Sequence, residues 1–172
     1  MNCKSCGKVA LESMELCRNC FIDSVENRIK KEIRLAPKEE PMIIVTDGTA
    51  ASKVLEKIVS QIQKESRKEL KKVSTLQENA FVPATLDEIN SDFLKGVFFR
   101  NNSGKNMQKF IFPLAKVTSE ECELYCRIKG ISFEKKNKDA MQEMLSAMDK
   151  SYPGTHFSLK SSRDQLEKIR KG

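Results

Sequence analysis

The spacing of apolar residues along the chain predicts helices packed around a short parallel sheet. A continuous run of four apolar residues, Met42–Val45, is typical of a buried parallel strand. The segment that follows, from Thr49 to about Lys72, repeats apolar residues every three or four positions and predicts an amphipathic helix. Its inward-facing residues are Val54, Leu55, Ile58, Val59 and Ile62. The same spacing upstream predicts a helix that packs on the following domain. The apolar residues of that helix are Phe21, Ile22, Val25, Ile29 and Ile33.

Capping motifs place two further helices. In "TSEECELYCRIKG", Thr118 and Glu121 have the spacing of a capping box, and Gly130 is a helix stop signal. Thr85 and Glu88 predict the same kind of box at the start of "LDEINSDFLKGVFF". The segments "KKVSTL", "NAFVPAT" and "QKFIFPLAKV" are predicted to be extended.

A last pair of helices is predicted around 139–148 and 162–171, on either side of "SYPGTHFSL". His156 lies in this turn region without an evident acidic or thiol partner, so we interpret it as a surface residue. Three methionines spaced by three and four predict a core-facing stripe on the helix around 139–148: Met141, Met144 and Met148.

Length and composition indicate one ordinary domain with a small appendage. The chain has 172 residues, and the proline-bounded linker Pro37–Pro41 separates a module, residues 1–36, from a main domain, residues 41–172. No stretch approaches the roughly 18 apolar residues of a membrane span, and no apolar segment follows the N-terminus as in a signal peptide. We therefore expect a cytoplasmic protein with no membrane partner.

Four of the six cysteines have the spacing of a metal site. Cys3, Cys6, Cys17 and Cys20 form two C-x2-C pairs ten residues apart, and each pair can turn two thiolates toward one ion. Gly7 supports the first turn. The sequence predicts a closed, structural Zn²⁺ site, with iron as the alternative metal.

The formal charge of +7 is unevenly distributed. The stretch from Phe93 to Val117 has five basic residues and no acidic one, which predicts a positive surface for a polyanion. The residues of this stretch that we assign to RNA binding are Lys95, Arg100, Lys105 and Lys109.

The turn between the first strand and its helix, "TDGTAAS", has the geometry of a phosphate-binding turn but not its usual residues. Strand, turn and helix N-terminus present backbone N–H groups to an anion. A phosphate loop normally has several glycines, whereas this turn has only Gly48, an acidic Asp47 and two alanines. A purely structural turn is therefore the favoured interpretation from these residues alone.

Four segments, in this order, resemble the tRNA wobble-uridine thiolation enzymes of the adenine-nucleotide alpha-hydrolase superfamily. The two cysteine pairs followed by "CF" and a basic helix resemble the zinc module of these enzymes. "IIVTDGTAASKVLEKI" lies where the family has its strand, S-G-G-x-D-S loop and helix. "FPLAKVTSEECELYCRIKGISF" is similar to the family's R-P-L segment, and "YPGTHFSL" to its late P-G-T turn. The resemblance implies an α/β, mostly parallel-sheet nucleotide-hydrolase-like domain flanked by helices.

The chain departs from this family pattern where the family binds ATP. The loop here consists of Asp47, Gly48, Thr49, two alanines and Ser52, so the family's acidic position is Ala51. Between Cys20 and Cys122 there is no cysteine, although catalytic members have sulfur- or cluster-binding cysteines there. The G-H-N-x-D-D motif retains only something like Leu86, Asp87 and Glu88.

These departures imply a degenerate, subunit-2-type protein rather than an enzyme. We expect a non-catalytic partner that binds a catalytic thiouridylase subunit and tRNA and supports 2-thiolation of the wobble uridine, with a homodimer in place of the heterodimer left open. One alternative is a residual ATP-dependent sulfurtransferase using Cys122 and Cys126, which lie one turn apart and are otherwise core residues. The other is a free-standing zinc-ribbon protein that binds nucleic acid.

Overall fold

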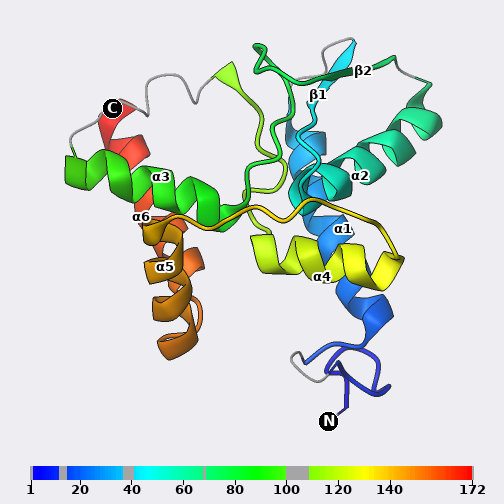
Figure 1. Cartoon of the computed structure of the whole chain (residues 1–172), viewed down its shortest axis with the longest axis horizontal. Helices are drawn as coiled ribbons and strands as arrows, with labels where there is room; N and C mark the ends of the chain where they lie inside the picture. The colour runs from blue at the N-terminus through cyan, green and yellow to red at the C-terminus, as the bar shows by residue number, and fades with distance from the viewer. Residues whose placement is uncertain (1, 12–14, 37–40, 68, 100–108, 172) are drawn as a thin grey trace.

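The computed structural model describes residues 2–11, 15–36, 41–67, 69–99 and 109–171. Its elements, labelled in Figure 1, are α1 (Arg18–Leu35), β1 (Met42–Val45), α2 (Ala50–Ser66), β2 (Leu70–Val73), α3 (Leu86–Phe99), α4 (Ser119–Lys129), α5 (Ala140–Ser151) and α6 (Thr155–Lys171). The linker residues 37–40, and Arg100 and Lys105 of the basic stretch, lie outside the described residues.

The sheet is a parallel pair joined by a helical crossover. Strands β1 and β2 pair from Met42 with Leu70 to Val45 with Val73, and α2 connects them. Phe81 adds single-residue parallel bridges to Ile44 on one side and Ile111 on the other. The α/β class is therefore confirmed. The strand predicted at "NAFVPAT" and the extended segment predicted at "QKFIFPLAKV" are reduced to these single-residue bridges, because Pro83 and Pro113 follow them and have no N–H to continue a ladder.

One hydrophobic core joins the helix of the cysteine module to the main domain. Helix α1 packs against α2 and α4, and α2 packs against α4 (Figure 1). All five apolar residues predicted to face inward on α1 are buried in this core. Arg28 of α1 also donates to both carboxylate oxygens of Glu121 on α4, at 3.1 and 2.5 Å. The prediction that α1 packs on the following domain is confirmed.

Helices α3, α5 and α6 pack against one another beside this core, on the side of the molecule away from α2 (Figure 1). Leu86, Ile89 and Leu145 are buried there. The predicted methionine core stripe is wrong, because Met144 and Met148 are 42% and 43% exposed. Leu145 and Gln142 are the buried residues of α5 instead.

Local capping explains where α4 begins and ends. Thr118 and Glu121 form the predicted capping box, and Gly130 ends the helix in the left-handed conformation at φ 66°. At α3 only half of the predicted box is present. Glu88 accepts a hydrogen bond from the Thr85 N–H, while the Thr85 hydroxyl bonds to Ser119 Oγ at 2.9 Å. The side chain of Thr85 therefore connects the starts of α3 and α4.

Helix α6 begins at Thr155, seven residues before the predicted start of the last helix. His156 lies in its first turn and is buried, with 5% of its surface exposed, so its prediction as a surface residue is wrong. The Asn90 side chain of α3 donates to the His156 carbonyl at 2.8 Å, which holds this turn against α3. Among the helices of the described residues, none has the length and apolar character needed to cross a membrane.

Candidate functional site

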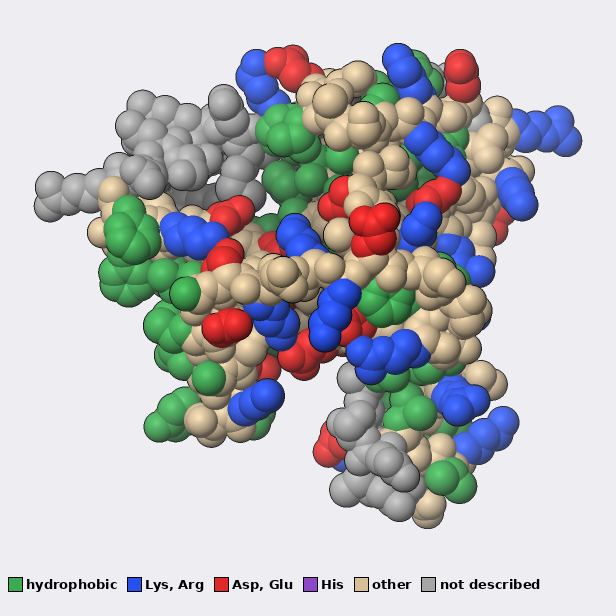
Figure 2. All heavy atoms as spheres, viewed as in Figure 1, with side chains coloured by type: hydrophobic (Ala, Val, Ile, Leu, Met, Phe, Trp, Pro, Cys, Tyr) green, Lys and Arg blue, Asp and Glu red, His purple; other side chains and the backbone are tan. Residues whose placement is uncertain are grey.

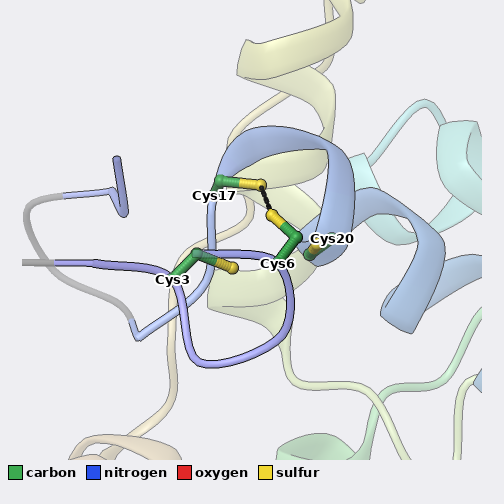
Figure 3. A group of neighbouring side chains, drawn as sticks. All are labelled: Cys3, Cys6, Cys17 and Cys20. Carbon is green, nitrogen blue, oxygen red and sulfur yellow. Dashed lines mark hydrogen bonds between the residues drawn. The ribbon is translucent and has the colours of Figure 1, made fainter. Parts of the chain in front are cut away.

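The four N-terminal cysteines come together as the spacing predicts. Their sulfur atoms all lie within 4.8 Å of one another, and the sulfurs of Cys6 and Cys17 are 3.5 Å apart (Figure 3). Cys3 and Cys17 are buried, whereas Cys6 is exposed. Such a group of thiolates can hold a metal ion.

Two different local structures aim the thiolates at one point. The first C-x2-C pair lies in a tight turn, in which the Gly7 N–H donates to the Cys3 carbonyl at 2.9 Å and the Cys3 N–H donates to the Lys8 carbonyl at 2.7 Å. Gly7 has φ +72°, a conformation that favours glycine. The second pair opens a helix, because Cys17 is the N-cap of α1. The thiolates therefore lie at the positive end of α1, which favours negative charge.

The thiols of this cluster perturb one another's pKa values. Backbone hydrogen bonds, first at Cys17, lower the pKa of Cys3 to about 6. A backbone hydrogen bond at Cys20 likewise lowers the pKa of Cys17. A hydrogen bond with Ser5 lowers the pKa of Cys20, but the neighbouring thiols, first Cys6, outweigh it and raise this pKa to about 12. A bound cation would offset the repulsion between neighbouring thiolates.

The donor set fits a single tetrahedral ion. With metal–sulfur bonds of about 2.3 Å, four thiolates around one ion lie about 3.8 Å from one another. The sulfur positions here require only small movements to reach that arrangement. Cys3, Cys6, Cys17 and Cys20 would each supply one thiolate, and the bound ion would hold the turn of residues 2–9 against the start of α1.

The turn between β1 and α2 uses its own side chains to satisfy its N–H groups. Asp47 accepts hydrogen bonds from the Thr49 N–H at 3.0 Å and the Thr49 hydroxyl at 2.6 Å. Thr49 is the N-cap of α2, and its hydroxyl accepts from the Ser52 N–H at 3.3 Å. Ser52 Oγ in turn accepts from the Asp47 N–H at 3.2 Å. The N–H groups of Asp47, Thr49 and Ser52 are therefore already in use.

A segment far along the chain covers this turn. The Glu134 N–H donates to the Gly48 carbonyl at 3.0 Å, and Glu134 forms a parallel bridge with Thr49. The Glu134 carboxylate lies against Gly48, so that a Cβ at position 48 would be 3.1 Å from its carboxyl carbon. A pocket beside the turn is lined by both acidic and basic side chains, among them Glu88, Glu123, Glu134, Lys136 and Lys138. Sequence reasoning missed Glu134, because no local pattern indicates that it reaches a turn 86 residues away.

No model of a known protein family matches the sequence, and no curated protein matches it. Among solved structures, the chain is similar to the U34-tRNA thiolase NcsA from Methanococcus maripaludis with its [4Fe-4S] cluster. The TM-score is 0.72 at 13% sequence identity, over 96% of this chain and 88% of that one. The chain therefore has a thiolase-like fold.

Asp87 and Glu88, the acidic residues compared above with the G-H-N-x-D-D motif, have structural partners. Asp87 is buried, and its carboxylate accepts from the Ser119 N–H at 2.8 Å and the Ser119 hydroxyl at 2.7 Å. Glu88 accepts from Thr85 and from Lys136. Asp87 therefore holds the starts of α3 and α4 together, and Glu88 connects the start of α3 to the segment before α5.

The thiols of α4 lie in the core. Cys122 and Cys126 have no exposed surface. Burial raises the pKa of Cys122 well above its usual value and raises the pKa of Cys126 to about 11. Neither thiol is therefore ionised near neutral pH, and neither is accessible as a nucleophile. Tyr125, between them, is also fully buried, and its hydroxyl donates to Glu26 at 2.9 Å.

The described lysines of the basic stretch have carboxylate partners from other segments. Lys95 bonds to Asp139 at 2.7 Å, and Lys109 pairs with Glu78. Hydrogen bonding to Asp139 raises the pKa of Lys95. The tertiary structure thus brings acidic residues to a stretch that contains none.

Proposed function

We propose that this protein is a non-catalytic subunit of a tRNA-thiolating enzyme and supports 2-thiolation of the wobble uridine. The observation that carries the proposal is the turn between β1 and α2. By the resemblance described above, this turn lies where the family binds a nucleotide, yet here Asp47 engages the Thr49 N–H and hydroxyl, and Glu134 places a second carboxylate against Gly48. A pyrophosphate here would meet two negative charges.

The buried thiols of α4 also support a non-catalytic role. A residual sulfurtransferase needs a thiolate that reaches the substrate, whereas Cys122 and Cys126 are fully buried and have raised pKa values. ATP activation and sulfur transfer would then belong to a catalytic partner subunit with an intact loop. This chain would contribute its scaffold and a surface for tRNA.

For the N-terminal cluster we propose a structural Zn²⁺. The U34-tRNA thiolase has a [4Fe-4S] cluster, but the sulfur atoms here are within 4.8 Å of one another, which suits one ion. A four-iron cluster would hold its thiolates farther apart, because each thiolate binds a different iron. We also propose that residues 1–36 form a metal-binding module and residues 41–172 the main domain.

For the tRNA surface we propose the stretch that contains Lys95, Arg100, Lys105 and Lys109. Lys95 and Lys109 exchange their present partners for phosphates at modest cost, because exposed ion pairs contribute about 0–1 kcal/mol. The chain carries a net charge of +7, which favours approach to a polyanion. The protein would act on tRNA in the cytoplasm together with the catalytic subunit.

Deletion of this protein from its native cell tests the proposal. We expect 2-thiouridine at the wobble position to fall, while the ATP-consuming activity copurifies with another chain. Re-expression of the wild-type protein is the matched control and should restore the modification. Normal 2-thiolation in the deletion strain, with no protein copurifying, would contradict the proposal and favour a free-standing nucleic-acid-binding protein.

A further inference from the structure

Exposed large apolar side chains are concentrated on one side of the molecule. Of the twelve in the described residues, nine belong to α3, α5 and α6 or to the turn after α5. Figure 2 shows hydrophobic side chains gathered at the edge formed by α3 and α5. Apolar surface of this extent on one side typically marks an interaction site. The nine are Val97, Phe98, Phe99, Met144, Met148, Tyr152, Phe157, Leu166 and Ile169.

Helix α5 carries an apolar stripe along its solvent side. Met144, Ala147 and Met148 are exposed at spacings of three and four, so they share one face of the helix. Leu145 and Gln142 are the buried residues of α5, which packs against α3 and α6. Such spacing is typical of a helix that packs against another helix. Within the described residues, no element covers this stripe.

Two opposite charges lie along one edge of this stripe. Glu143 and Lys150 are seven residues apart, which places them on the same side of the helix, about 10 Å from each other along its axis. Both are exposed, and neither forms an ion pair with another described residue. The sign of the charge therefore reverses from one end of the stripe to the other.

We propose that α5 pairs antiparallel with α5 of a second copy of this chain, around a two-fold axis near residues 146 and 147. A two-fold contact is self-complementary, so Glu143 of each copy faces Lys150 of the other. On the other edge of the stripe the two methionines of each copy meet those of its partner, where their flexible side chains adapt to one another. A second copy of α5 therefore complements both the charges and the apolar stripe of this helix.

The size of the contact sets the expected strength of the dimer. Helix α5 has 12 residues, about 18 Å of helix. With Tyr152 at its end, such a stripe buries less than the roughly 800 Å² per partner of a stable complex. We therefore expect a dissociation constant of about 10–100 μM.

Sedimentation velocity on the metal-loaded full chain, at about 1 to 300 μM, tests the proposal with charge-reversal variants. The wild-type chain should form a dimer. Glu143→Lys or Lys150→Glu alone places like charges opposite each other at both ends of the contact, and should weaken the dimer roughly tenfold. The combined variant, Glu143→Lys with Lys150→Glu, restores opposite charges and should restore the dimer.

Lys64→Glu, an exposed change on α2, is the matched control and should leave dimerisation unchanged. Circular dichroism checks that each variant is folded. A chain that stays monomeric to 300 μM, single reversals without effect, or a combined variant that stays as weak as the single ones would overturn the proposal. The measurement uses the isolated chain without tRNA, so its result is independent of the proposed thiolation role.

Discussion

Removing the two carboxylates at the turn between β1 and α2 should restore some affinity for phosphate. The variant we consider combines Asp47→Ser and Glu134→Gln. The first change frees the Thr49 N–H and hydroxyl, which Asp47 now engages at 3.0 and 2.6 Å. The second removes the charge that lies against Gly48.

The magnitude follows from the charges at the turn. Two unit charges about 5 Å apart interact by roughly 0.8 kcal/mol in water and 3 kcal/mol near a protein surface. Both carboxylates are exposed, so the lower value applies and their combined repulsion of one phosphate charge is about 1.6 kcal/mol. The positive N-terminus of α2 attracts the same phosphate charge by only about 0.3–1 kcal/mol. The wild-type turn is therefore net repulsive, and the double variant should bind roughly 15-fold more tightly.

Isothermal titration calorimetry with inorganic pyrophosphate and with ATP, both without Mg²⁺, measures this difference. We expect no wild-type binding at millimolar concentration and measurable binding by the double variant. Glu65→Gln, which removes an exposed charge near the other end of α2, is the control and should bind no better than wild type. Micromolar wild-type binding, or a double variant indistinguishable from wild type, would refute the reasoning and revive an ATP-dependent activity.

Three further predictions concern the metal, acid stability and RNA. Cys17→Ser should lose the one zinc ion per chain that elemental analysis is expected to find, whereas Cys122→Ala should keep it. Burial alone would raise the pKa of Asp139, but its hydrogen bonds with Lys95 and the start of α5 hold that pKa below its usual value. Its stabilisation is therefore present above about pH 4 and is lost as the pH falls through the lowered pKa. Asp139→Asn keeps an N-cap side chain but removes the charge, so it should cost about 0.5 kcal/mol at pH 7 in urea unfolding, and this difference should vanish in acid. Lys105→Ala with Lys109→Ala should flatten the log-log salt dependence of tRNA binding by up to about 2, and an unchanged slope would remove this stretch from the RNA surface.

The amino-acid sequence by itself determined the features that depend on neighbours within a few positions. The capping box of Thr118 and Glu121 and the stop at Gly130 lie where predicted, because a helix terminus is satisfied by groups three or four residues away. The two C-x2-C pairs come together as their spacing predicts. The inward face of α1 follows directly from its period of 3.6 residues.

Features that depend on distant segments were decided only by the tertiary structure. Glu134 reaches Gly48 across 86 residues, and Asp139 reaches Lys95 across 44. The methionines of α5 have the spacing of a buried stripe, but the periodicity of a helix marks an apolar face without saying whether another element covers it. The sequence around His156 predicts an exposed turn. In the structure, Asn90 of α3 bonds to the His156 carbonyl and the residue is buried. Packing between helices far apart in the chain sets these environments, and no local hydrogen bond or period records them.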